Sequence, residues 1–403
     1  MKEMSAVNPR MLQLGQVRSV IRETFEYGLR RAQAIGRENV FDFSLGNPSV
    51  PAPSAVGEEI ARLATEKDAV SLHGYTTAAG APQVREAIAA NINARFGTSI
   101  GVGDLYLTCG AAASLSAVLG ALFLPGEELV VPAPFFPEYS VFAAQAGATL
   151  VPVACDPPKF HLPLDRMATL ITPRTKAVLI NTPNNPTGVQ IPLSDLRALA
   201  ALLTERSREY GHPIFLISDE PYRELVYEKG AELPYLTTLY DRTVVCYSYS
   251  KSLSLPGERI GYVCVSPTMP EHDEVYAAVC GAGRALGYVC APSLMQHLLP
   301  ACLGLTADRD VYRRNRDLLY QNLTEMGFEC VYPDGAFYLF MKAPEPDAAA
   351  FCLRARDFEL LLVPSESFGC TGYVRISYCV ATETIERALP AFRSLAAAYG
   401  LDR

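Results

Sequence analysis

Four polar residues follow apolar stretches of the sequence at nearly regular intervals. Asn185 follows AVLINTP, Asp219 and Tyr222 follow PIFLIS, and Lys251 follows TVVCYSY. The steps from 185 to 219 and from 219 to 251 are 34 and 32 residues, about one strand–helix–strand unit each. Singly, each has an ordinary explanation: a turn for NNPTG, a helix cap for Asp219, a loop anchor for Tyr222 or a solvated position for Lys251. Together they predict an amide, a carboxylate, a phenol and an amine in one crevice.

Such a set of groups favours one kind of ligand. A buried carboxylate needs a cation opposite it, and an amine can attack an electrophilic carbonyl. An amide and a phenol can share an oxygen anion. Pyridoxal 5′-phosphate offers a protonatable ring nitrogen, an aldehyde and a ring oxygen, so the four residues predict a site in which this cofactor serves as the electron sink.

Two segments are expected to hold the cofactor phosphate. LTCGAAASL passes from a strand through a glycine to a helix start, where backbone N–H groups attract anions. SYSKSLSLPGER offers serine hydroxyls and, after a Pro-Gly break that lets the chain turn back, an arginine with a charged fork. The predicted phosphate site consists of Gly110, Ala111, Ala112, Ser248, Ser250 and Arg259.

The elements that must position these groups are those of an α/β protein. From about residue 104 to 265, short apolar runs alternate with helical patterns, such as the one over 193–211 that ends in a glycine. This alternation predicts a mostly parallel sheet covered by helices on both faces, with ligands beyond the carboxyl ends of the strands. The last hundred residues predict an α+β lobe. We expect a large domain over 51–299 and a small domain formed by 1–50 and 300–403.

Composition excludes several classes of protein. The formal net charge of -8 argues against a nucleic-acid or membrane-surface partner. The 11 cysteines contain no CxxC pair and the first residues lack the apolar core of a signal peptide, so free thiols in the cytoplasm are expected. The longest apolar run, 111–124, is shorter than the roughly 20 residues that span a bilayer. The five histidines show no metal-ligand spacing, so no metal site is expected.

The motifs resemble the class I/II aminotransferases of the aspartate aminotransferase superfamily, which have PLP fold type I. SYSKSLSLPGERIGY looks like the family's cofactor-lysine signature, with the phosphate-binding arginine eight residues after the lysine. NNPTG, SDEPY and GYTTAAGAPQVREAIA match further blocks in the expected order. The resemblance extends from SLGNP at 44–48 to YVRISY at 373–378 and implies a seven-stranded type of sheet in the large domain.

The resemblance implies roles for the cofactor-binding residues. Lys251 would form the Schiff base and move the proton in a ping-pong transamination, with Asp219 on the ring nitrogen. Asn185 and Tyr222 would bind the ring oxygen, and Phe136, in PAPFFPEY, would stack on the ring. The phosphate residues keep the roles given above.

The resemblance also implies a substrate site and an assembly. Arg375 would clamp the α-carboxylate of an amino acid or 2-oxo acid bidentately, a task for which lysine is less suited. The backbone of Gly46 and the side chain of Asn185 would contact the same substrate. Tyr75, in GYTTAAG, would reach the phosphate of the neighbouring subunit, which implies a homodimer with shared active sites. Tyr75 and Phe136 could instead be ordinary core aromatics.

The sequence leaves three questions open. A carbon–sulfur β-lyase is the closest alternative, because the same lysine, aspartate and phosphate residues serve several reactions. A ligand-sensing domain without catalysis is a remote one, disfavoured by the acidic charge and the absence of room for an N-terminal helix-turn-helix. The substrate is undetermined: Arg284, in GAGRALGYVCAP, would favour aspartate or glutamate if it turned inward and an apolar or aromatic side chain if it faced solvent.

Overall fold

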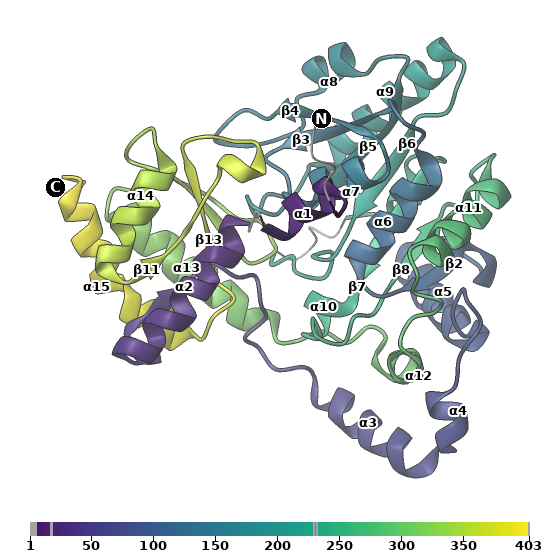
Figure 1. Ribbon diagram of the computed structural model, residues 1–403, viewed down its shortest axis with the longest axis horizontal. Coiled ribbons are helices and arrows are strands. Elements are labelled where there is room, and N and C mark those ends of the chain that lie inside the picture. The colour runs from purple at the N-terminus through teal and green to yellow at the C-terminus, as the bar shows by residue number, and fades with distance from the viewer. Residues whose placement is uncertain (1–5, 17–18, 229, 231–232, 402–403) are drawn as a thin grey trace.

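A seven-stranded sheet forms the centre of the larger lobe of the computed structural model, which describes residues 6–16, 19–228, 230 and 233–401 (Figure 1). The strand order is β2-β8-β7-β6-β5-β3-β4. β8 runs antiparallel to both of its neighbours and the other pairs are parallel, which confirms a mostly parallel sheet. The strands are β2 (Leu105–Thr108), β3 (Glu128–Ala133), β4 (Thr149–Ala154), β5 (Thr175–Asn181), β6 (Phe215–Asp219), β7 (Thr243–Ser248) and β8 (Gly261–Val265).

Helices cover both faces of this sheet, as the alternating pattern predicts. Val178 and Leu179 are neighbours on β5, yet Val178 packs in the cluster that contains Leu199 of α9, and Leu179 packs in the one that contains Val118 of α6. This follows from the alternation of side chains along a strand. The covering helices are α5 (Pro82–Phe96), α6 (Ala111–Leu122), α7 (Glu138–Gln145), α8 (Leu164–Leu170), α9 (Leu193–Tyr210), α11 (His272–Ala285) and α12 (Ser293–Cys302). α9 ends at Gly211, which has the left-handed φ of 72°.

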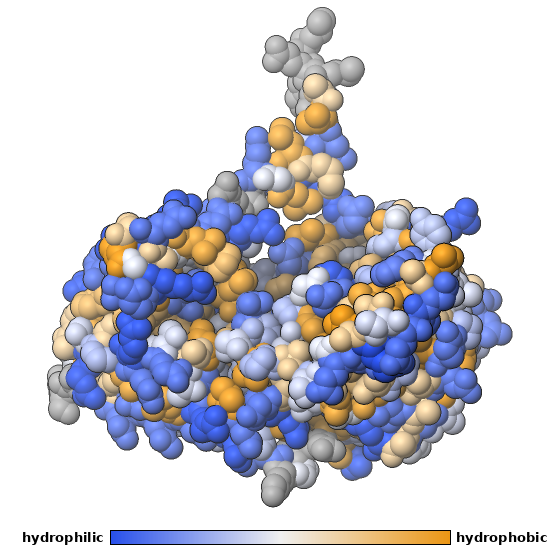
Figure 2. Space-filling view, turned by 90° about the horizontal axis from the view of Figure 1, so that it is seen from below, coloured by the Kyte–Doolittle hydropathy of each residue, from blue (hydrophilic) through white to orange (hydrophobic). Residues whose placement is uncertain are grey.

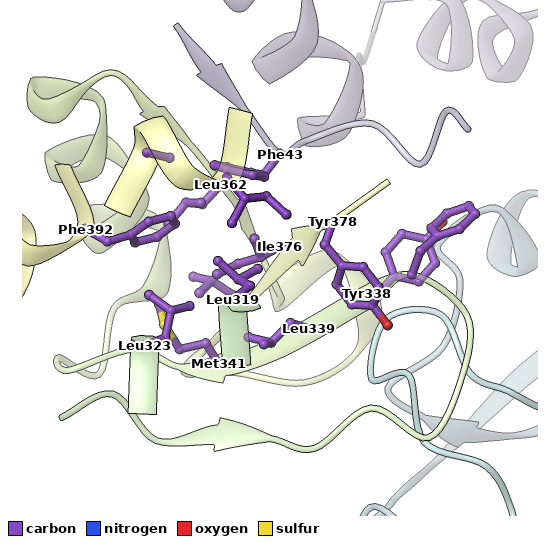
Figure 3. Packing of buried hydrophobic residues seen from close by; sticks show 14 of the residues in the cluster. Phe43, Leu319, Leu323, Tyr338, Leu339, Met341, Leu362, Ile376, Tyr378 and Phe392 are labelled. Carbon is purple, nitrogen blue, oxygen red and sulfur yellow. The ribbon is translucent and has the colours of Figure 1, made fainter. Parts of the chain in front are cut away.

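The smaller lobe is an α+β unit around a second sheet of order β12-β13-β10-β9. β13 pairs antiparallel with β10 and β12. Its strands are β9 (Cys330–Val331), β10 (Tyr338–Lys342), β12 (Val363–Pro364) and β13 (Tyr373–Ser377), and its helices are α13 (Arg309–Glu325), α14 (Ala348–Ala355) and α15 (Thr382–Ala398). Figure 3 shows side chains from α13, α15, β10 and β13 converging in one core.

The segment before residue 50 joins the smaller lobe. β1 (Phe41–Asp42) pairs parallel with β11 (Leu360–Leu361), and the Phe43 ring lies 5.8 Å from the Phe392 ring of α15 (Figure 3). α2 (Val20–Ile35) packs closely here, because a Cβ added at Gly28 would lie 2.7 Å from Leu361. The N-terminal segment therefore belongs to the same packing unit as the C-terminal residues.

Several helices lie at the margins. α1 (Pro9–Gln16) has no buried residue, and Figure 2 shows it projecting from the body with apolar side chains exposed. α3 (Ser54–Glu66) and α4 (Ala69–His73) extend along one side of the larger lobe, and the short α10 (Tyr249–Ser252) follows β7 (Figure 1). Short 3₁₀ helices occupy Arg37–Asn39, Val102–Asp104, Leu236–Thr238, Arg356–Phe358 and Glu366–Phe368. Within the described ranges, no helix combines the length and the apolar character needed to cross a membrane.

Candidate active site

A cavity of about 270 Å³, partly open to solvent, lies where the carboxyl ends of β5, β6 and β7 face the smaller lobe. It receives residues from three distant parts of the chain: the N-terminal segment, the large sheet and strands β10 and β13. Of the fourteen residues singled out from the sequence, those that line the cavity are Gly46, Ala111, Ala112, Phe136, Asn185, Asp219, Tyr222, Ser248, Ser250, Lys251, Arg259 and Arg375.

Lys251 lies three residues beyond the end of β7, in α10 rather than on the strand. Its Nζ donates a hydrogen bond of 2.6 Å to the carbonyl oxygen of Gly46 and lies 5.4 Å from the centre of the Phe337 ring. Burial lowers the pKa of this amine to about 8, because the cavity wall solvates an ammonium poorly. About a tenth of the amine is therefore a neutral nucleophile at pH 7, against fewer than about one in a thousand for a solvated lysine.

Asp219 ends β6 with one carboxylate oxygen satisfied and the other not. Oδ2 accepts a hydrogen bond of 2.5 Å from the hydroxyl of Tyr139, whereas Oδ1 is buried without a partner. Burial raises the pKa of this carboxyl group to about 7. A buried carboxylate with an unused oxygen is costly unless a cation or hydrogen-bond donor meets it, so this geometry fits a protonated ring nitrogen.

The loop after β5 is held against Asp219 by backbone and side-chain hydrogen bonds. The N–H of Asn185 donates to Oδ1 of Asn181 at 2.7 Å, and Nδ2 of Asn181 donates to the carbonyl oxygen of Asp219 at 2.9 Å. Oδ1 of Asn185 accepts from Nη1 of Arg375 at 3.1 Å. These contacts fix Asn185 between the large sheet and the arginine of the smaller lobe.

A pair of tyrosine hydroxyls joins the two lobes beside the lysine. The Tyr222 and Tyr338 hydroxyl oxygens lie 2.7 Å apart, and burial raises the pKa of Tyr222 well above its ordinary value. Tyr338 also stands close to Gly46, because a Cβ built on that glycine would lie 2.2 Å from the Tyr338 hydroxyl oxygen. Only a glycine fits at position 46 without a shift of Tyr338.

The expected phosphate residues lie together at the start of α6. Gly110 caps this helix with a φ of 88°, and an added Cβ would come within 2.9 Å of Nη2 of Arg259. Arg259 itself has a left-handed φ of 54°, an uncommon conformation for a side-chain-bearing residue. Its Nη1 lies 3.5 Å from the Ser250 hydroxyl, which accepts from the Ser248 hydroxyl at 2.8 Å. Free N–H groups at the helix start, two hydroxyls and a guanidinium form a cradle for a dianion.

Arg375 is buried at the centre of β13, close to two aromatic rings. Its guanidinium carbon lies 4.8 Å from the Tyr338 ring centre and 5.2 Å from that of Phe368. Nη2 donates to the carbonyl oxygen of Ser44 at 2.5 Å, while Nε has no partner. This stacking holds the guanidinium plane in one orientation, as bidentate recognition of a carboxylate requires.

Three residues considered from the sequence are not among those that line the cavity. Gly110 is one of them, although it caps α6 next to the lining residue Arg259. Tyr75 follows α4 with 93% of its surface exposed, so this chain's own Tyr75 is not a core aromatic. Arg284 lies in the last turn of α11, exposed, and is not among the residues that line the cavity.

Sequence reasoning missed other residues that structure the site: Asn181, Tyr139 and Tyr338. Tyr139 stands three residues after Phe136 in PAPFFPEY, which was the available signal.

Cys379 was also missed; its Sγ lies 3.6 Å from the carbonyl oxygen of Leu45. Over the part of the chain that the structure describes, no three or more metal-binding side chains cluster together.

Several known proteins resemble this chain in both fold and sequence. A crystal structure of an amino transferase from Eubacterium rectale is 52% identical, with a TM-score of 0.96 and coverage of 98% of this chain and 100% of that one. Aspartate aminotransferase from Thermus thermophilus, solved with maleate, is 29% identical, with a TM-score of 0.85 over 97% of this chain and 100% of that one. The probable aspartate/prephenate aminotransferase of Thermus aquaticus is 32% identical over 79% of this chain and 82% of its own length.

The fold is therefore PLP fold type I, and the protein is an enzyme of the transaminase class, EC 2.6.1. The family model for aminotransferase class I and II matches residues 38–392, and the chain belongs to that family. This confirms the resemblance read from the motifs, the fold class and the enzyme class. Amino acids and 2-oxo acids are the substrates that fit this activity.

Proposed function

We propose that this enzyme transfers an amino group between an L-amino acid and a 2-oxo acid in two half-reactions, with pyridoxal 5′-phosphate attached at Lys251. The observation that carries the proposal is the pairing, in one cavity, of a buried amine of lowered pKa with a buried carboxylate oxygen that has no partner. An aldehyde opposite the amine and a cationic ring nitrogen opposite the carboxylate would satisfy both groups at once.

The remaining residues fit the rest of the cofactor. Asn185 and Tyr222 would meet the ring oxygen, Phe136 the ring face, and the cradle around Gly110 and Arg259 the phosphate. When bound, the cofactor supplies an electron sink for the carbon that loses its proton. Any residue other than glycine at position 110 would place its Cβ 2.9 Å from Nη2 of Arg259. The cradle therefore depends on that glycine.

The chain's own residues would handle the substrate and the proton. Arg375, with its free Nε and fixed plane, binds the α-carboxylate and so places the substrate Cα within reach of Lys251. Lys251, whose lowered pKa leaves part of the amine neutral, would accept the proton from the substrate Cα and deliver it to the carbon on the far side of the substrate nitrogen. Tyr222 and Asn185 stay in place through Tyr338 and Arg375, respectively.

We further propose a homodimer in which Tyr75 of each subunit reaches the phosphate of the other. Tyr75 is exposed over 93% of its surface, and Val70, five residues earlier, is also exposed, which supports a partner surface at this end of the larger lobe. We also propose a cytoplasmic location, since all 11 cysteines are free thiols, as a reducing compartment allows.

The domain division expected from the sequence, 51–299 against 1–50 with 300–403, is also part of this proposal. The pairing of β1 with β11 and the shared core of Phe43 and Phe392 support it. Limited proteolysis that released a stable fragment ending near residue 299 would agree with it, and a fragment ending within β6 would contradict it.

The test of the proposed function is borohydride reduction of the cofactor-loaded protein, followed by peptide mass analysis. We expect the mass of the reduced cofactor on the peptide containing Lys251 and none on the peptide containing Lys176, a half-buried lysine of β5 outside the cavity. Lys251→Ala should show no label, while Lys176→Ala should be labelled like wild type. Release of pyruvate and ammonia from cysteine without an oxo-acid acceptor would favour the β-lyase instead.

A further inference from the structure

Each of the four charged groups that line the cavity already binds the cofactor or the substrate α-carboxylate in the proposed function. Among the lining residues of the described chain, these groups are Asp219, Lys251, Arg259 and Arg375. Asp219 faces the ring nitrogen, Lys251 the aldehyde, Arg259 the phosphate, and Arg375 the α-carboxylate. No cation is left over for a second carboxylate on the substrate.

Apart from the residues already assigned and the polar Asn181 and Tyr338, whose side chains bond to Asp219 and Tyr222, the walls of the cavity are apolar and come from both lobes. Ile21 of α2 and Leu45, just after β1, lie on the side of the smaller lobe, and Leu115 of α6 and Phe142 of α7 on the side of the larger one. Ile21 and Phe142 are half-buried, so both have surface left for a ligand, whereas Leu115 is buried. A substrate side chain directed away from Arg375 and Lys251 therefore meets aliphatic and aromatic surface.

Arg284, the one arginine considered for recognition of a dicarboxylate, lies away from this wall. It is exposed on α11 and outside the cavity lining, so it does not neutralise an acid in this chain's own site. An acidic side chain would have to lose its hydration among apolar groups without a counter-charge, which disfavours binding strongly.

We infer that the amino donor of this enzyme carries a large apolar or aromatic side chain, bound between Ile21 and Leu45 on one side and Leu115 and Phe142 on the other. This inference rests on the proposed function. The α-carboxylate is held by Arg375 in every substrate, and the apolar wall decides among side chains.

The test is a half-reaction screen of the holoenzyme with phenylalanine, leucine, aspartate, glutamate and alanine, followed by the change in absorbance of the bound cofactor. We expect kcat/KM for phenylalanine or leucine to exceed that for aspartate and glutamate by about 100-fold. Equal or higher efficiency with aspartate or glutamate overturns the inference and leaves the proposed function intact. A panel in which no amino acid changes the spectrum of the loaded protein contradicts the proposed function itself.

Substitutions in the apolar wall test which of its residues recognise the substrate side chain. Phe142→Ala should lower kcat/KM for phenylalanine about tenfold or more and leave alanine within about twofold, because alanine does not reach the wall. Phe142→Arg should raise the ratio of aspartate to phenylalanine at least tenfold. Ile21→Ala tests the opposite side with an independent change. Leu170→Ala, an exposed leucine of α8 outside the cavity, is the matched control.

Arg284→Ala tests whether Arg284 contributes to the binding of an acidic substrate. We expect the ratio of aspartate to phenylalanine to stay unchanged in this variant. A selective loss of activity with aspartate would show that Arg284 reaches a substrate carboxylate in the assembled enzyme and would overturn the inference.

Discussion

The Tyr139 hydroxyl donates a hydrogen bond of 2.5 Å to Oδ2 of Asp219 and so ties α7 to the end of β6. The contact satisfies one oxygen of a buried carboxylate that lines the cavity and leaves the other oxygen without a partner. It also opposes the effect of burial, because a donated hydrogen bond favours the charged form and lowers the pKa. Tyr139 is therefore a positioning residue for Asp219.

Tyr139→Phe should weaken this arrangement. We expect kcat/KM to fall about tenfold, the loss typical of one hydrogen bond to a charged group. The acid limb of the pH profile of kcat/KM should move to higher pH, because Asp219 without its donor takes up a proton more readily. Tyr210→Phe is the control, since the Tyr210 hydroxyl donates to the carbonyl oxygen of Ile171 away from the site. An unchanged acid limb in Tyr139→Phe would contradict the role.

Asp219 should destabilise the cofactor-free protein at alkaline pH. Its pKa is raised by burial to about 7 in the folded state, so the folded chain binds this proton more tightly than the unfolded chain does. The stability it contributes is complete below its ordinary pKa, near 4, and is lost as the pH rises through about 7.

Asp219→Asn should therefore raise the free energy of unfolding of the cofactor-free protein at pH 8, by up to about 4 kcal/mol, and change it little at pH 4. The same variant should lose most of its turnover when loaded with cofactor. Denaturant unfolding at the two pH values measures the first effect, with the exposed Asp273→Asn as control. A variant less stable than wild type at pH 8 would rule out this account.

The rate of cofactor capture should depend on the charge of Lys251. The neutral amine is the nucleophile, and burial lowers the pKa of Lys251 to about 8, so capture by the cofactor-free protein should accelerate as the pH rises through about 8 and then level off. Stopped-flow absorbance between pH 6 and 10 measures this. A rate that keeps rising beyond pH 10 would indicate an ordinary, solvated lysine.

Arg375→Lys should separate substrate binding from cofactor binding. Lysine keeps the charge but loses the planar fork, so we expect KM for amino acids to rise by about 10²-fold or more while the cofactor stays bound. Absorbance of the bound cofactor checks its retention. Arg354→Lys is a matched control, because Arg354 also stacks on an aromatic ring, that of Tyr399, but is exposed on α14. Loss of cofactor in Arg375→Lys would reassign the residue.

Gly46→Ala should damage the substrate site through Tyr338. The added Cβ would stand 2.2 Å from the Tyr338 hydroxyl oxygen, so the ring must move from its place beneath Arg375. We expect KM to rise about tenfold or more, and Tyr338→Phe in the same chain to restore part of the loss, because removing the hydroxyl leaves the next ring atom 3.1 Å away. Tyr338→Phe alone gives the baseline. No recovery in the double variant would place the damage elsewhere.

The sequence predicted the site better than the contacts that hold it. Lys251, Asp219 and Asn185 stand out because polar residues end apolar runs, a pattern confined to a few neighbouring positions. The hydrogen bond between Tyr139 and Asp219 joins residues 80 positions apart, and no local pattern encodes it. Tyr338 was missed for the same reason, since its partner Tyr222 lies in the other lobe.

The same limit applies to the fold. The apolar runs and the glycine after α9 predicted the elements of the large sheet, because periodicity and caps are local. The reversed direction of β8 was not predicted, since a fully buried strand has the same composition in either direction. The partnership of β1 with β11 joins residues 41 and 360, which only the folded chain brings together.

Two of the reactive side chains stand beyond the strands, with Asn185 four residues after β5 and Lys251 three after β7, whereas Asp219 ends β6 and Arg375 lies within β13. The segments that carry Asn185 and Lys251 are therefore separate in sequence from the buried strands β5 and β7 that precede them. A hybrid that keeps these segments but takes β5 and β7 from a more thermostable relative should be active at a higher temperature with the same substrates.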